Sequence, residues 1–228
     1  MIRMAIKIFL LLLCVIFQGG CSATVYPPAA LVEPVTIYIA SYGKHSSLIL
    51  PTRQGQYAEY ATGDWPIYVE NKDSYLSYVR AGLLSRKTAL ARRDIRTDDV
   101  NDASFLGVLK LIPIEVEYLR AAALSDELDT WFVSALRLSP DYPVYNPLTR
   151  LHAVPWPRQY RVWDNCNHQT SRWLRQIGCD VRGMSVLADY KIRHRNAGAT
   201  RPSTEGASSE KTPENLNSSL HPHAARPH

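Results

Sequence analysis

The sequence predicts an α+β domain in which a small antiparallel sheet packs against helices. Four segments carry the pattern of short strands, at residues 35–39, 45–50, 57–62 and 88–95. Four others carry helical spacing, at residues 74–84, 113–124, 126–136 and 166–177. Strands that come early in the chain, with helices around them, indicate the α+β class.

The N-terminus has the pattern of a secretory signal. Arg3 and Lys7 precede an apolar run from Ile8 to Phe17, which is too short to cross a bilayer. The small residues Gly19 and Gly20 then precede Cys21, an order that resembles the lipobox of bacterial lipoproteins. That resemblance implies a signal peptide over residues 1–20 and a lipid on Cys21 after cleavage.

The residues around Cys21 also bear on its destination. An aliphatic residue is usual where this chain has Gln18, so an ordinary signal peptide cut near Ala23 and an uncleaved anchor stay open as alternatives. Ser22 follows the cysteine in place of an aspartate, which by resemblance to lipoprotein sorting favours the outer membrane. We expect a lipid-anchored protein on the periplasmic face of the bacterial cell envelope.

Composition divides the rest of the chain into three parts. Residues 21–34 are proline-rich and are expected to form a tether. Residues 35–192 have the size of one ordinary domain with a real core. Residues 193–228 are rich in Ser, Thr, Pro, Asn, Glu and His and almost free of apolar residues, so we expect a disordered tail.

The charge distribution excludes nucleic acid as a partner. The chain has a formal net charge of +5, but the signal peptide and the tail each carry an excess of two positive charges. The body between them is therefore almost neutral. A nucleic-acid-binding domain needs a basic face for phosphate, which this body lacks.

Cys166 lies where an amphipathic helix is expected to begin. Its apolar stripe continues through Thr170, Trp173, Leu174 and Ile177, and Gly178 is placed to end it. Asp164 or Asn165 is expected to be the N-cap. Free N–H groups and the positive end of the dipole stabilise a thiolate at this position, which favours a nucleophile. The alternative is a small buried cysteine that only packs.

The remaining cysteines neither form a disulfide nor suggest a metal site. Cys14 is removed with the signal peptide. Cys166 and Cys179 lie at opposite ends of the expected helix, roughly 20 Å apart at about 1.5 Å per residue, which is too far for a disulfide. Cys166 with His168 does not have the spacing of a zinc finger, and no second ligand pair is visible. We expect a reduced Cys166 and no metal or cofactor.

His45 is the best candidate for a base that activates the thiol. His168 is only two positions along the helix from Cys166 and therefore faces away from it. His45 begins a strand beside a glycine turn, and Glu59 on the next strand is placed to orient its ring. Asp64 is the second candidate for that orienting role.

These residues resemble known families. His45 at a strand start, a polar residue on the next strand and Asn165-Cys166-x-His168 at a helix start are similar to the circularly permuted papain-like fold. The lecithin:retinol acyltransferase group and the NlpC-type lipoproteins share that fold. A bacterial lipoprotein domain family of unknown function is closer still, with Gly43-x-His45, Glu59 to Asp64 and the cysteine helix. The resemblance covers about residues 35–184.

The resemblance implies a thiol enzyme with Cys166 as nucleophile, His45 as base and Glu59 as third residue. Retinol acyltransferase relatives have a histidine in the third position. Such a site hydrolyses or transfers acyl groups at amide or ester bonds, with the Cys166 N–H and Tyr42 as expected oxyanion donors. An envelope protein meets cell-wall peptides and lipids as substrates. The alternatives are an inactive lipid-anchored protein that binds through its Tyr/Trp-rich segment near residues 142–160, and a structural envelope lipoprotein.

Overall fold

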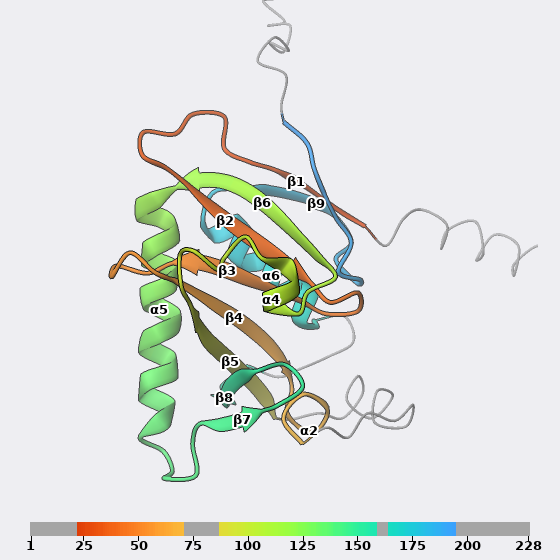
Figure 1. The fold of residues 1–228 in the computed structure, drawn as a ribbon. Helices are drawn as coiled ribbons and strands as arrows, with labels where there is room; N and C mark the ends of the chain where they lie inside the picture. Colours follow the sequence, from red (N-terminus) through yellow and green to blue (C-terminus); the bar gives the residue numbers. More distant parts are fainter. Residues whose placement is uncertain (1–21, 71–86, 159–163, 195–228) are drawn as a thin grey trace, which may run out of the picture. The chain divides into compact units, whose positions relative to one another are not determined.

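An antiparallel sheet forms the centre of the described chain, a computed structural model covering residues 22–70, 87–158 and 164–194 (Figure 1). Its seven strands lie in the order β6 (Lys110–Glu117), β2 (Pro34–Ser41), β3 (Ser46–Pro51), β4 (Tyr57–Asp64), β5 (Thr88–Ile95), β8 (Leu151–Trp156) and β7 (Val144–Asn146). The predicted signal peptide, Cys21, the helix at 74–84 and the tail beyond 194 lie outside the described residues.

Helices cover both faces of this sheet. The two longer ones, α5 (Tyr118–Leu136) and α6 (Cys166–Gln176), pack on one face. The short α4 (Ala103–Leu106) lies in front of the sheet in Figure 1, and α6 lies behind it. A fourth helix, α2 (Trp65–Tyr68), follows directly from β4. The predicted α+β class is confirmed.

Strand alternation divides the core into two layers. On the α6 side, Leu48, Leu50 and Tyr60 are fully buried in one cluster with Trp173 and Leu174 of the helix. On the α4 side, alternate residues such as Ile49 pack in a second cluster with Leu106 and Val100. The predicted strands at 35–39, 45–50, 57–62 and 88–95 correspond to β2, β3, β4 and β5.

The helix predicted at 113–124 is wrong in its first half. Residues 110–117 form β6, which pairs with β2 from Pro34↔Glu117 to Ser41↔Lys110. Ile112, Ile114 and Val116 are buried between exposed neighbours, which is the period of a strand. β6 is an edge strand of the described sheet, and a proline, which has no backbone N–H to donate, is tolerated there. α5 then runs unbroken through Ser125.

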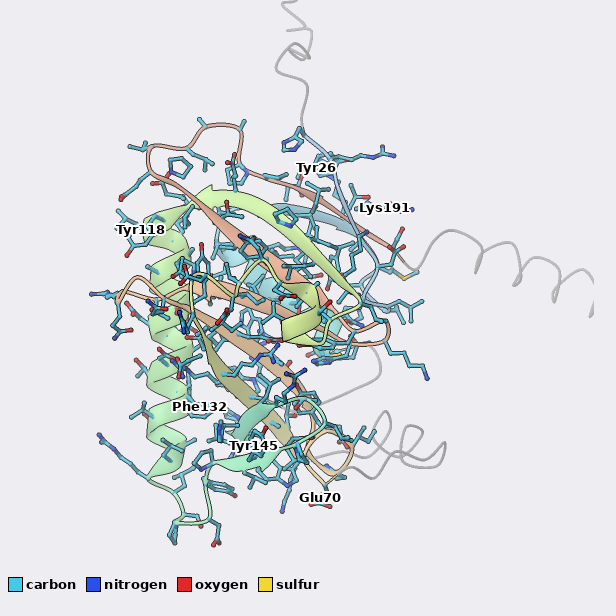
Figure 2. The ribbon with its side chains drawn as sticks, in the orientation of Figure 1. Tyr26, Glu70, Tyr118, Phe132, Tyr145 and Lys191 are labelled. Atoms are coloured by element: carbon cyan, nitrogen blue, oxygen red, sulfur yellow. The ribbon has the colours of Figure 1, made fainter. Side chains whose placement is uncertain are left out.

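Two segments expected to be irregular contain strands. Residues 138–157, where no strand or helix was predicted, hold β7 and β8, with β8 paired to β5 and β7. Part of the predicted tether is also structured, because β1 (Ala23–Tyr26) pairs with β9 (Asp180–Gly183) and β10 (Tyr190–Ile192). Figure 2 shows Tyr26 and Lys191 on the paired strands β1 and β10. Ala23 and Val25 are fully buried, so the domain begins before residue 35.

Among the described residues, no helix has the length and apolar character needed to span a membrane.

Candidate functional site

Cys166 is the first residue of α6, as predicted, and Asn165 is the N-cap. The Asn165 Oδ1 accepts the backbone N–H groups of Asn167 at 3.0 Å and His168 at 3.1 Å. The His168 Nδ1 lies 2.9 Å from the same oxygen, so this imidazole belongs to the cap, as expected of a side chain facing away from Cys166. At the other end, Gly178 has a φ of +100°, which terminates the helix.

We expect Asn165→Ala to lower the free energy of unfolding by about 1 kcal/mol, because two backbone N–H groups lose their acceptor. Asn165→Asp is the matched control, since its carboxylate keeps an acceptor at the helix start and should cost much less. Urea denaturation followed by circular dichroism measures both. An unchanged midpoint for Asn165→Ala would show that the cap contributes nothing.

The start of α6 is hydrogen-bonded to the β2–β3 hairpin. The Ser46 hydroxyl donates to Asn167 Oδ1 at 2.8 Å, and Asn167 Nδ2 donates to the carbonyl of Lys44 at 3.0 Å. Thr170 Oγ1 contacts the Ser46 hydroxyl at 3.1 Å, one helical turn further on. The backbone that carries His45 is therefore held against the cysteine end of the helix.

Cys166 is a buried thiol in this arrangement, 7% exposed. Burial raises the pKa of Cys166 to about 11, although backbone hydrogen bonds from Ser46 and Asn167 act in the opposite direction. The resting side chain at neutral pH is thus a neutral thiol rather than the thiolate that the helix dipole favours. Cys166 and Cys179 are both free, as predicted from their separation along the helix.

His45 directly precedes β3, and its carbonyl accepts the Tyr42 N–H at 2.8 Å to close the hairpin. The imidazole centroid lies 5.1 Å from the Tyr68 ring and 5.9 Å from the Tyr42 ring. Its Nε2 is buried and has no hydrogen-bond partner among the described residues. Burial lowers the pKa of His45 to about 4, so the ring is neutral at neutral pH and able to accept a proton.

Strand alternation separates the side chains of Ser46 and His45. Ser46 points toward α6, whereas Ser47 points to the opposite face, where its hydroxyl donates to Glu59. His45 lies on the Ser47 face, beside Tyr68. The structure therefore places Cys166 against the backbone that follows His45. A direct contact between the sulfur and the His45 ring stays a prediction.

The predicted hydrogen bond from the His45 ring to Glu59 is wrong. Glu59 is fully buried, and its Oε1 accepts from the Tyr42 hydroxyl at 2.6 Å and from Ser47. Its Oε2 pairs with the Arg93 guanidinium at 2.6 Å. Three donors on the neighbouring hairpin and on β5 thus occupy the carboxylate. The Tyr42 hydroxyl, expected as an oxyanion donor, is engaged in the same network.

Asp64, the second candidate for the orienting role, lies on the other face of β4. Its Oδ1 accepts the N–H of Ile67 at 3.2 Å and caps α2. Alternation puts Asp64 on the side of Tyr60, which packs in the cluster that contains Trp173 of α6. The Asp64 carboxylate is therefore a helix cap and does not reach the His45 ring.

Tyr68, whose ring lies beside that of His45, was not predicted from the sequence as a site residue. Its hydroxyl oxygen is buried and has no hydrogen-bond partner in the described part of the chain. Burial, with the nearby acidic groups Glu59, Tyr42 and Cys166, raises the pKa of Tyr68 well above its ordinary value, so the phenol remains a donor. The available signal was Gly63, where an added Cβ would lie 2.8 Å from the Tyr68 ring.

Within the described ranges, no three His, Cys, Asp or Glu side chains are grouped as metal ligands. Comparisons with family models, with curated proteins and with solved structures found no match to this chain.

Proposed function

We propose that this chain is an envelope lipoprotein with a cysteine–histidine thiol site that hydrolyses or transfers acyl groups at amide or ester bonds. One observation carries the proposal. Cys166 is the first residue of α6, and hydrogen bonds from Ser46 and to the carbonyl of Lys44 join the next residue of the helix to the hairpin that carries His45. A nucleophile needs such a place, where N–H groups surround the reacting atoms.

The two pKa shifts indicate how the thiol would react. A neutral thiol and a neutral imidazole exclude a resting ion pair, so His45 would take the proton of Cys166 as the sulfur attacks the carbonyl carbon. The resulting oxyanion would accept the N–H of Cys166 and the hydroxyl of Tyr68. Expulsion of the amine or alcohol, with the proton returned from His45, gives an acyl-enzyme. Water or another acceptor then releases the acyl group.

The anchor and the substrate class complete the proposal. Lipid on Cys21 would hold the domain at the periplasmic face of the membrane, where cell-wall peptides and lipids present amide and ester bonds. The lipobox pattern supports this location.

The proposal predicts that an activated ester acylates Cys166. Purified protein incubated with p-nitrophenyl acetate should release p-nitrophenol in a burst and carry one acetyl group on Cys166, found by peptide mass spectrometry. Cys166→Ala should abolish the burst, and His45→Ala should slow it by about 10²-fold or more because the general base is lost. Cys179→Ala is the matched control and should react like the unaltered protein.

Two results would contradict the thiol mechanism. An acetylated Cys166 that forms equally fast in His45→Ala would remove His45 from the reaction. A Cys166 that stays unmodified in folded protein would favour the second candidate function, an inactive lipid-anchored binding protein. The raised pKa and the burial of Cys166 favour that candidate, since both are typical of a cysteine that only packs.

A further inference from the structure

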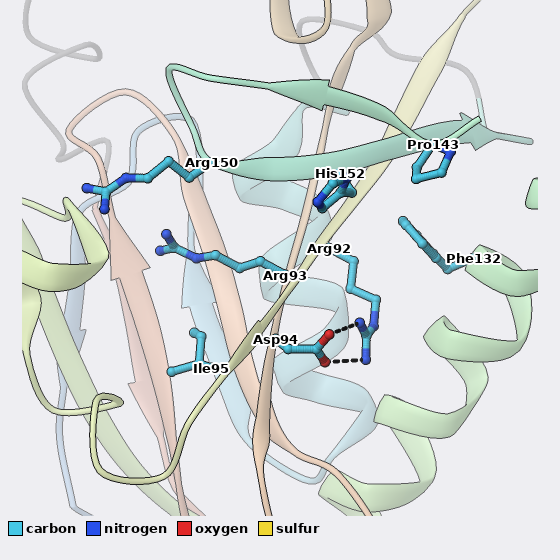
Figure 3. Close-up of a pocket in the computed structure, with 8 residues that line it drawn as sticks. All are labelled: Arg92, Arg93, Asp94, Ile95, Phe132, Pro143, Arg150 and His152. Atoms are coloured by element: carbon cyan, nitrogen blue, oxygen red, sulfur yellow. Dashed lines mark hydrogen bonds and ion pairs between the residues drawn. The ribbon is translucent and has the colours of Figure 1, made fainter. Parts of the chain in front are cut away.

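Two guanidinium groups meet at the loop that follows α4. Arg93 of β5 donates through Nη2 to the carbonyl of Leu106 at 2.9 Å. Arg150, in the turn before β8, has its Nη2 so close to Gly107 that an added Cβ there would lie 3.1 Å away. Figure 3 shows the two side chains extending in the same direction, Arg93 from β5 and Arg150 from the turn before β8.

Only one of these two cations is paired with a carboxylate among the described residues. Arg93 pairs with the buried Glu59. The exposed side chain of Arg150 has no hydrogen-bond or ion-pair partner among the residues that the structure describes. Arg150 also has a φ of +57°, a left-handed conformation that costs free energy in a residue with a side chain. The positive charge of Arg150 is thus held close to that of Arg93, although the backbone conformation of Arg150 is unfavourable.

A groove with a volume of about 490 Å³ runs from this pair along the end of β5. Its walls include Phe132, Pro143 and His152 (Figure 3). β8 pairs with β5 only from Thr88 to Arg92, whereas β4 pairs with it as far as Ile95. No described strand therefore pairs with the outer edge of residues 93–95, which leaves its backbone groups for a ligand, and a groove of this size holds a small ligand.

The other charges in the groove are balanced internally. Arg92 pairs with Asp94 at 2.8 Å and with Asp129 of α5 at 2.6 Å. The unbalanced charge thus lies at one end, on Arg150, and the strand edge leads away from it. A ligand that matches both features is an extended chain with an anionic end.

We propose that this groove binds an extended peptide that adds to the outer edge of β5 and places its C-terminal carboxylate on Arg150, next to Arg93. Arginine suits this role because its planar N–H donors bind a carboxylate through two bonds. The strand edge supplies hydrogen bonds to any sequence, and the apolar walls contact its side chains. The site does not depend on the proposed thiol chemistry, since none of its residues touches the bonds that would react.

The test is a titration of the full-length protein with acetyl-Ala-Ala-Ala that has a free carboxylate, followed by NMR. We expect the Arg150 Nε–H and the backbone amides of Asp94 and Ile95 to shift together, with saturation below about 10 mM peptide. The same peptide with a C-terminal amide should bind about tenfold or more weakly, and so should Arg150→Gln. Arg182→Gln removes an exposed arginine of β9 and should bind normally.

Several outcomes would overturn the assignment. They are an absence of shifts up to about 10 mM peptide, equal binding of acid and amide, or normal binding by Arg150→Gln. Inorganic phosphate should shift Arg150 alone and bind more weakly than the peptide acid. Binding of phosphate as tight as that of the peptide would show an anion site without a contribution from the β5 edge. Repeating the titration on Cys166→Ala, which should bind equally, separates this result from the fate of the thiol mechanism.

Discussion

Replacement of Glu59 by Gln is expected to lower the free energy of unfolding by about 3–5 kcal/mol, because it leaves the Arg93 guanidinium buried without its counter-charge. Glu59 is fully buried, and the Arg93 side chain is only 10% exposed. Water can therefore replace the lost carboxylate only in part. The glutamine amide can still accept from Ser47 or Tyr42, so the loss reflects charge more than hydrogen bonding.

Urea denaturation of Glu59→Gln, Arg93→Gln and the double variant measures this pair directly. If the pair is coupled, the double variant should lose less stability than the sum of the two single losses. Glu115→Gln, an exposed glutamate on β6, is the matched control and should change stability by less than about 0.5 kcal/mol. A Glu59→Gln protein as stable as the original would contradict the buried ion pair. If that stable variant also acetylated Cys166 slowly, Glu59 would be an orienting residue after all.

The sequence predicted elements best where local pattern and burial agree. β2 and β3 have one face in the cluster that contains α6 and the other in the cluster that contains Leu106 of α4. The α6 boundaries followed from the apolar stripe and from Asn165 and Gly178. Residues 113–124 fit both a helical pattern and a strand pattern. Pro113 and the glutamates after it fit a first helical turn, but pairing with β2 made the segment an edge strand.

The places of Cys166 and His45 in their elements were predictable from the sequence, and the hydrogen-bond partners of Glu59 were not. The spacing around Cys166 predicted the start of α6, and the glycine turn predicted the start of the strand after His45; hydrogen bonds of Asn167 join these two elements. The partner of Glu59 depends on the register between β4 and β5, where Glu59 lies opposite Arg93. No local pattern sets that register for residues 34 positions apart. Tyr68 was missed for a similar reason, since its place beside His45 depends on the turn of α2 over Gly63.

Alkylation of Cys166 by iodoacetamide is expected to be about 100-fold slower at pH 7 than that of a free cysteine. The reagent reacts with the thiolate, and burial raises the pKa of Cys166 from its ordinary value of 9.0 to about 11. Each pH unit by which the pKa rises reduces the thiolate population tenfold at neutral pH. The rate should therefore climb about tenfold per pH unit from pH 7 and level off only near pH 11.

The raised pKa of Cys166 also makes the free energy of unfolding fall at alkaline pH. The unfolded chain ionises Cys166 at its ordinary pKa, whereas the folded chain keeps the proton until about pH 11. The neutral thiol thus stabilises the fold below the ordinary pKa, and the contribution is lost as pH rises toward 11, by up to about 2–3 kcal/mol. Cys166→Ser should lose much of this alkaline dependence, whereas Cys179→Ala should keep the part due to Cys166. An alkylation rate that levels off near pH 7 would show instead that Cys166 is a thiolate at rest, and His45 would then be its ion-pair partner rather than a neutral base.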